Sequence, residues 1–313
     1  PGGYYCAVDG LSNVSGECLA GYYCNGSSTL MNPVNETFGD ICPKGYYCPL
    51  NSSYPVPCDE GYYSDWFGNH NVSSCLPCKE GMYCSGPGRD LPEGNCSDGW
   101  FCPAGSTVPQ PPGNECSSGH RCPQGSGKEI ACLSGTYQPF TVQGICLECP
   151  AGSYCDQNEA IAEEQSGAGK LTHGVVTPKV CPAGFYCPSG TQTSRQYPCP
   201  VGKYSNTTGL ENEDNCRDCP TGYYCEASNI TQPTGQCVAG FYCILAATSP
   251  TPLLSDAGGP CPQGSYCGSG WSYPTPCPKG TYGERAELPS LNDCTICLPG
   301  KYCASSNLSA PSG

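Results

Sequence analysis

A seven-residue pattern bounded by two cysteines constrains this chain more than any other feature. It reads CPKGYYC at 42–48, and close variants recur along the chain. Cysteine pairs separated by five residues stand at 18/24, 42/48, 78/84, 96/102, 116/122, 149/155, 181/187, 219/225, 237/243, 261/267 and 297/303. Because proline fixes φ for a turn and glycine permits a positive φ, each copy predicts a tight corner in the backbone.

Aromatic residues often fill the two positions between the glycine and the second cysteine. Examples are Tyr46 with Tyr47, Tyr62 with Tyr63, Tyr223 with Tyr224, and Phe241 with Tyr242. We expect these rings to cover a disulfide and the chain of the next loop, since tyrosine combines an apolar body with a hydroxyl that can face water. The copy CSSGHRC (116–122) departs from the pattern, with His120 and Arg121 in the aromatic positions.

A longer unit of six cysteines contains most of these corners. Its gaps of 5, 9, 16, 2 and 5 residues run from Cys42 to Cys84 and recur from Cys261 to Cys303, and related units start at Cys116 and Cys181. The predicted divisions are a partial repeat with an extra corner (1–41), a repeat (42–115), a repeat with a Cys-free insert at 156–180 (116–180), a repeat with an insert at 244–260 (181–260) and a truncated repeat (261–313). A short helical turn is expected at 158–165. Both ends fall within the repeat frame, so we expect a segment of a longer tandem-repeat chain.

Sequential pairing accounts for every cysteine but one. The count of 31 is odd, and joining neighbours in order leaves Cys6 unpaired. The longer loops would then be closed by Cys58 with Cys75, Cys132 with Cys146, Cys199 with Cys216, and Cys277 with Cys294. Interleaved pairs, such as 58–78 with 75–84, remain open because spacing alone does not fix connectivity. Chain entropy gives a seven-residue loop about 2.4 kcal/mol and an eighteen-residue loop about 3.2 kcal/mol.

The composition favours covalent order over a large core. Cys 31, Gly 42 and Pro 33 in 313 residues are typical of a disulfide scaffold with dense turns. The predicted fold class is small disulfide-rich repeats, forming an elongated solenoid or rod of short β-hairpins and loops, with little helix and no large hydrophobic core. Such cysteine density indicates an oxidising compartment.

Nine Asn-x-Ser/Thr sequons also point to an extracellular, secreted or cell-surface chain. They begin at Asn13, Asn25, Asn35, Asn51, Asn71, Asn95, Asn206, Asn229 and Asn307. Each predicts an exposed, N-glycosylated asparagine. Runs of Ser, Thr and Pro at 107–113, 247–252 and 309–313 suggest O-glycans on the same surface.

Charge and hydropathy argue against two classes of partner. The net charge of -14 disfavours nucleic acid and anionic lipid. No apolar run approaches the roughly 20 residues of a membrane span, so no membrane insertion is expected in this segment.

We expect no catalytic residues, no bound metal and no cofactor beyond glycans. The Cys-x2-Cys pairs at 75/78, 146/149, 216/219 and 294/297 lie too far apart for zinc ribbons, whose second pair follows about 15–20 residues later. His70, His120 and His173 have no second ligand nearby in sequence and are expected to be exposed loop residues. The acidic run at 211–216 lacks the EF-hand spacing and is expected to be a solvated loop.

Three long runs resemble the ephrin-receptor-like cysteine-rich repeat, at 57–84, 199–225 and 277–303. That repeat reads roughly Cys-x-x-Gly-x-aromatic-Ser, a short polar loop, then Cys-x-x-Cys-Pro-x-Gly-x-Tyr, and the resemblance covers nearly the whole chain. Long arrays with sequons are similar to extracellular glycoproteins of algae and other protists, including the hair (mastigoneme) proteins of flagella. The resemblance implies a structural secreted glycoprotein that self-associates into a filament or coat. The alternative is a ligand-binding or stalk ectodomain of a cell-surface receptor.

The insert at 244–260 is apolar for so polar a chain. Its residues Ile244, Leu245, Leu253 and Leu254 are expected to be exposed. Exposed apolar patches often mark contacts, so these residues are the candidate self-association interface. An insert folded back on its own repeat remains an equal alternative.

Overall fold

The computed structural model describes residues 1–166, 174–253 and 256–313. The chain divides into two compact units. Unit 1 comprises Pro1–Leu133, Tyr137–Leu147 and Gln157–Thr177, and unit 2 comprises Ser134–Thr136, Glu148–Asp156 and Pro178–Gly313. Most of both units consists of short antiparallel hairpins, so the expected class of small disulfide-rich repeats is confirmed.

Every sheet among the described residues has two short strands. In unit 1 the pairs are β1 (Tyr4–Tyr5) with β2 (Gly16–Glu17), β3 (Tyr22–Cys24) with β4 (Gly39–Ile41), β5 (Tyr46–Tyr47) with β6 (Val56–Pro57), β7 (Tyr62–Tyr63) with β8 (Leu76–Pro77), β9 (Met82–Tyr83) with β10 (Gly94–Asn95), and β11 (His120–Arg121) with β12 (Ile130–Ala131). In unit 2 they are β15 (Ser153–Tyr154) with β16 (Lys179–Val180), β17 (Lys203–Tyr204) with β18 (Arg217–Asp218), β19 (Tyr223–Tyr224) with β20 (Gly235–Gln236), β21 (Phe241–Cys243) with β22 (Gly258–Pro260), β23 (Ser265–Tyr266) with β24 (Thr275–Pro276), and β25 (Thr281–Tyr282) with β26 (Thr295–Ile296). A further pair joins β13 (Thr136–Tyr137) to β14 (Leu147–Glu148).

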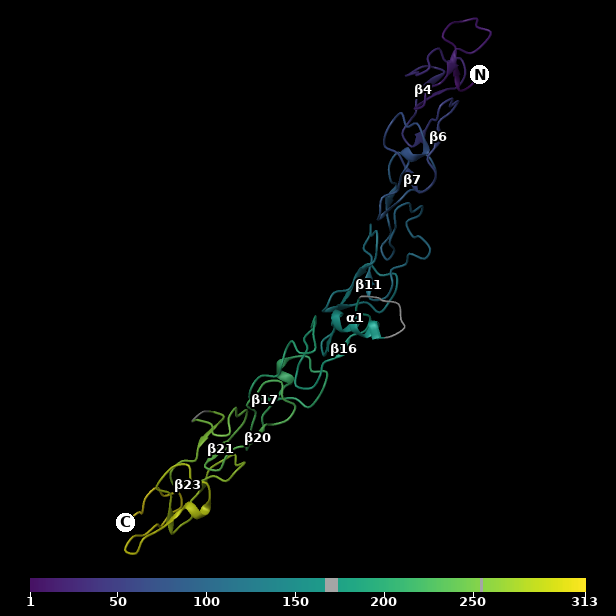
Figure 1. The fold of residues 1–313 in the computed structure, drawn as a ribbon. Helices are drawn as coiled ribbons and strands as arrows, with labels where there is room; N and C mark the ends of the chain where they lie inside the picture. The colour runs from purple at the N-terminus through teal and green to yellow at the C-terminus, as the bar shows by residue number, and fades with distance from the viewer. Residues whose placement is uncertain (167–173, 254–255) are drawn as a thin grey trace. The chain divides into compact units, whose positions relative to one another are not determined.

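Helical structure is sparse in the described part of the chain. The α-helix α1 spans Gln157–Ser166 and contains the turn expected at 158–165 (Figure 1). The 3-10 turns η1 (Val72–Ser74), η2 (Glu213–Asn215) and η3 (Leu291–Asp293) each end just before the cysteine that closes a longer loop. The acidic run at 211–216 is therefore one copy of a recurring turn, capped by the side chains of Asn212 and Asn215.

The repeating element is smaller than the six-cysteine unit. We call it a corner: seven positions from a first cysteine, through a central glycine, to a second position that is usually cysteine. The central glycines are Gly3, Gly21, Gly45, Gly61, Gly81, Gly99, Gly119, Gly135, Gly152, Gly184, Gly202, Gly222, Gly240, Gly264, Gly280 and Gly300. All have φ between 79° and 93°, a conformation that glycine adopts without the steric cost of a Cβ.

In four corners another residue occupies the second position. These residues are Ser64, Gln138, Ser205 and Gly283, and all four are buried like the cysteines they replace. The first cysteine of each such corner, at 58, 132, 199 and 277, then bonds forward to the cysteine that ends the longer loop. Corners and longer loops are therefore two forms of one element.

Each central glycine hydrogen-bonds to the following corner through both of its backbone groups. At Gly81, the carbonyl accepts the Cys96 N–H (2.8 Å) and the N–H donates to the Cys102 carbonyl (2.8 Å). The same two bonds recur at every central glycine from Gly3 to Gly280. The glycine is thus the point at which one corner is attached to the next.

Two more backbone bonds complete each junction. Gly105 donates to the Cys78 carbonyl (2.8 Å), and Cys84 donates to the Ser106 carbonyl (3.0 Å). Equivalent bonds recur in both units, so successive corners within each unit form a ladder of backbone hydrogen bonds. Within a unit, each corner therefore bonds chiefly to its neighbours, as in repeat proteins.

Cysteines make up most of the buried core. Fifteen disulfides join the described cysteines in sequential order, and none follows the interleaved alternative. Cys6 is the free cysteine. The second aromatic of a corner packs on the next disulfide: Tyr63 contacts Cys78 and Cys84. Tyr62, the first aromatic of the same corner, is 42% exposed, whereas Tyr63 is 5% exposed.

Candidate functional site

The sequon asparagines are the most numerous candidate site residues. All nine, from Asn13 to Asn307, are exposed. Exposure is the condition that a glycan requires, and their use as glycosylation sites stays a prediction.

Three of these asparagines have a second role in the ladder. Asn51, Asn229 and Asn307 have φ of 66°, 59° and 63°. They lie three or four residues after a corner, at a place where many other corners are followed by glycine and where the backbone approaches the central glycine two corners earlier. Asparagine is among the few residues that tolerate this left-handed conformation. Their identity therefore has a backbone reason as well as a glycan reason.

Hydrogen bonds orient several sequon side chains. The Asn51 Nδ2 donates to the Tyr4 hydroxyl (3.1 Å), and the Asn307 Oδ1 accepts from the buried Ser265 Oγ (2.8 Å). Asn71 precedes η1, where the Ser73 Oγ of its own sequon donates to its Oδ1 (2.5 Å). Asn95 lies in β10, next to Cys96 of the 96–102 disulfide.

The candidate interface at 244–260 is only partly displayed. Leu245 is 47% exposed and Leu253 is 84% exposed. Ile244 is half-buried, and its N–H donates to the Ala257 carbonyl (2.9 Å). Leu254 lies outside the described residues. The insert therefore folds back on its own repeat while presenting two leucines.

Sequence reasoning missed an exposed pair of aromatic rings in unit 1. Trp66 is 70% exposed and Phe67 is 59% exposed, on the loop between Cys58 and Cys75. The signal was available, because two bulky aromatics follow one another there within the otherwise polar run 64–71.

The histidines are not alike. His70 is exposed, His173 lies outside the described residues, and His120 is buried, which corrects the expectation that it is an exposed loop residue. His120 lies in β11 at the first aromatic position of its corner, so its ring takes the place of an aromatic side chain. In the described residues, no three His, Cys, Asp or Glu side chains gather closely enough to hold a metal ion.

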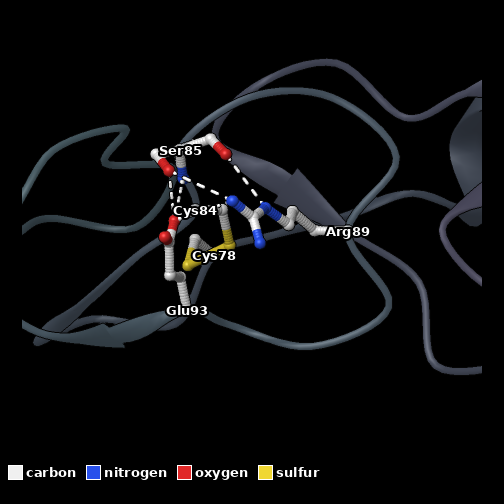
Figure 2. A network of polar contacts seen from close by, with 5 residues as sticks. All are labelled: Cys78, Cys84, Ser85, Arg89 and Glu93. Atoms are coloured by element: carbon white, nitrogen blue, oxygen red, sulfur yellow. Dashed lines mark hydrogen bonds and ion pairs between the residues drawn. A yellow bond between two sulfur atoms is a disulfide. The ribbon is translucent and has the colours of Figure 1, made fainter.

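A cluster of polar side chains closes the loop after Cys84 (Figure 2). The Ser85 amide donates to the Glu93 Oε2 (3.2 Å), and the Ser85 hydroxyl also donates to it. The Arg89 Nη2 pairs with the same carboxylate oxygen (3.1 Å), and its Nε donates to the Ser85 carbonyl (2.9 Å). The hydrogen bond from the Ser85 hydroxyl lowers the pKa of Glu93, with smaller contributions from the Ser85 amide and from Arg89.

Two equivalent loops identify this cluster as a structural clamp. After Cys6, the Ala7 amide donates to the Ser15 Oγ (2.9 Å). After Cys225, the Glu226 amide donates to the Thr234 Oγ1 (3.2 Å). Both bonds span eight residues, as does the bond from Ser85 to Glu93. The Glu93 carboxylate therefore has the same structural role as the hydroxyl groups of Ser15 and Thr234 in the equivalent loops.

Comparison with known proteins finds a distant relative. No family model matches the chain. The chain is 25% identical to mouse (Mus musculus) zonadhesin over 364 aligned residues, which cover 95% of this chain and 6% of zonadhesin. The chain thus spans a small fraction of the length of the curated relative it matches. Within the described residues, no helix is both long and apolar enough to cross a bilayer.

Proposed function

We propose that this chain belongs to an extracellular glycoprotein with a structural or adhesive, non-enzymatic role. The fifteen disulfides require an oxidising compartment, and the exposed sequons are placed where glycans can be attached. The observation that carries the proposal is the ladder, in which every junction combines backbone bonds with a cross-linked corner. Such an array resists extension and proteolysis without a large core.

The finer proposal is a subunit of an extracellular filament or coat, built from ephrin-receptor-like repeats. The ladder supports it, because a repeat that bonds only to its neighbours can be lengthened without changing any junction. Loops that leave the ladder, such as 244–260, would make contacts between copies. Contacts that do not close on themselves would give a filament.

A second candidate is an adhesive or ligand-binding ectodomain. The similarity to zonadhesin over nearly the whole chain favours it, since the name of that protein describes an adhesin. In this reading the ladder is a spacer, and the contacts are made with a different molecule.

Electron microscopy and sedimentation velocity of the glycosylated chain distinguish the two candidates. Filaments or concentration-dependent oligomers are expected if the chain self-associates. A monomer at all concentrations would contradict the filament proposal and would leave the ectodomain as the better account.

A further inference from the structure

The four longer loops display different side chains in one equivalent segment, the three residues that follow the second corner position. Each loop leaves a corner whose second position is not cysteine and re-enters the ladder four residues later. The displayed residues are Trp66 and Phe67 in the first loop, Phe140 (64% exposed) in the second, the sequon at Asn206 in the third, and Glu284 with Arg285 in the fourth. The same three-residue segment therefore carries bare aromatic rings in unit 1 and a glycan acceptor in the third loop, in unit 2.

The loop that carries Trp66 is held by a buried asparagine. The Asn69 Nδ2 donates to the Ser64 Oγ (2.7 Å), to the Trp66 carbonyl (2.9 Å) and to the Tyr46 carbonyl (3.0 Å). The loops of unit 2 have the buried leucines Leu210 and Leu288 at this position. Asn69 thus replaces an apolar packing residue by a polar brace that fixes the backbone of Trp66, and a preorganised ring loses less entropy on binding.

A lysine from the preceding corner extends the aromatic surface. The Lys44 Nζ lies 5.4 Å from the centre of the Phe67 ring, within the range of a cation–π contact. This contact orders Phe67 without burying it, and 59% of the side chain remains exposed.

We propose that Trp66 and Phe67 form a carbohydrate-binding surface, and that its ligand is a neutral sugar ring of an N-glycan on a second copy of this chain. The inference rests on the proposed function, in which the sequons are glycosylated and copies associate. The C–H face of a pyranose packs against an exposed aromatic ring, so such a surface needs no pocket.

Size and charge favour a glycan over a protein surface. Two aromatic side chains supply at most about 500 Å², well below the roughly 800 Å² that each partner contributes to a stable protein interface. A sugar ring fits the smaller area. Two copies that each carry a net charge of -14 repel one another, whereas a neutral glycan reaches across the gap without bringing charged surfaces into contact.

The test compares self-association of four samples of the secreted, glycosylated chain by sedimentation velocity. They are the unchanged chain, Trp66→Ala, Phe140→Ala as the matched control on the equivalent loop, and the unchanged chain after enzymatic removal of its N-glycans. Trp66→Ala and glycan removal are each expected to weaken association by about tenfold or more, while Phe140→Ala leaves it unchanged. N-glycans released from the same material are added to the monomer, with tryptophan fluorescence as the readout.

Each outcome separates this inference from the proposed function. Association that survives Trp66→Ala overturns the carbohydrate surface and leaves self-association intact. Association that needs Trp66 but survives glycan removal shows a protein contact, which also overturns it. If no sample associates, the filament proposal fails, and the fluorescence titration decides alone: saturable quenching that Trp66→Ala abolishes supports the surface, and no response overturns it.

Discussion

At the scale of the residue, the central glycine of the corner is the most constrained position in the chain. Its positive φ places both backbone groups toward the next corner, and its missing Cβ leaves room for a carbonyl two corners ahead. At Gly81, an added Cβ would lie 2.1 Å from the Gly125 carbonyl oxygen. The Cα of Gly81 therefore carries only hydrogen at a point where three successive parts of the chain lie close together.

Gly81→Ala is expected to break its junction. The substitution adds roughly 1–2 kcal/mol for the left-handed backbone and a clash that only backbone movement relieves. Hydrogen exchange should lose the protection of the Gly81 and Cys96 amides. Gly113→Ala is the control, because Gly113 has φ of 83° but no atom within 4 Å of the added Cβ. If both variants lost the same amount of stability, the left-handed backbone conformation, and not the close approach of the Gly125 carbonyl, would account for the destabilisation.

Asn51 should separate its backbone role from its glycan role. Asn51→Gly and Asn51→Gln both remove the sequon, but only glycine adopts a φ of 66° without strain. We expect the thermal midpoint of Asn51→Gln to fall below that of Asn51→Gly by the equivalent of about 1–2 kcal/mol. Ser53→Ala, which removes the sequon and keeps Asn51, measures the contribution of the glycan alone. Matching midpoints for the glycine and glutamine variants would contradict the backbone role.

At the scale of the element, the corner and the longer loop differ in one residue. Ser64 is fully buried at the position where most corners have their second cysteine, and its carbonyl accepts the Gly45 N–H (2.8 Å), as a cysteine carbonyl does elsewhere. The ladder is therefore independent of the disulfide that closes the corner. The partner that the first cysteine bonds determines only the length of the closed loop.

This equivalence predicts a change of disulfide partner. In the double variant Ser64→Cys/Cys75→Ser, Cys58 is expected to bond the new cysteine, since the backbone already has the corner geometry. Peptide mapping by mass spectrometry would find the new bridge, with the loop that contains η1 left open. Ser64→Cys alone leaves three cysteines in competition and should give mixed bridges and lower secretion. A double variant that leaves Cys58 as a free thiol would refute the equivalence.

The clamp at Glu93 predicts a local dependence on pH. The pKa of this carboxyl is lowered in the folded chain, so its stabilisation is complete above the unfolded pKa, near 4.3, and is lost as the pH falls through the folded value. Hydrogen exchange of the Ser85 amide, referred to the intrinsic rate at each pH, should therefore lose protection on acidification. Glu93→Gln should remove most of this dependence. The matched amide of Glu226, which donates to a threonine hydroxyl, should show none.

The sequence predicted the covalent framework but not the ladder of backbone hydrogen bonds. Cysteine spacing suggested sequential pairing because extra cysteines enter two at a time, and the glycine of each corner predicted a positive φ. Four corners end in Ser64, Gln138, Ser205 or Gly283, so the spacing of cysteines alone does not mark them. The ladder could not be predicted from the sequence, because its hydrogen bonds join backbone groups and the residue types do not indicate which groups pair. The bonds that hold the backbone at Trp66, from Asn69 to Ser64, Trp66 and Tyr46, were likewise not readable from the sequence.

At the scale of the whole molecule, stability is expected to be a sum of local terms. Backbone bonds join each corner to its neighbours, and the close approaches at the glycines reach two corners ahead. The buried residues of unit 2 form several small clusters, such as the one formed by Cys237, Cys243 and Ala247. Arrays of this kind lose order near a defect and keep it elsewhere.

Removing one disulfide in unit 2 tests this locality. In Cys261→Ser/Cys267→Ser, the corner at Gly264 loses its cross-link, which a chain-entropy estimate values at about 2.4 kcal/mol. Hydrogen exchange should rise at the Gly240 and Cys277 amides, which belong to the adjoining junctions. The Gly202 amide, three corners away, should keep its protection, since no ladder bond links it to the altered corner. Uniform loss of protection throughout unit 2 would instead mean that the unit unfolds cooperatively. In that case the corners of unit 2 would fold and unfold together, and the free energy of unfolding would not be a sum of independent contributions from each corner.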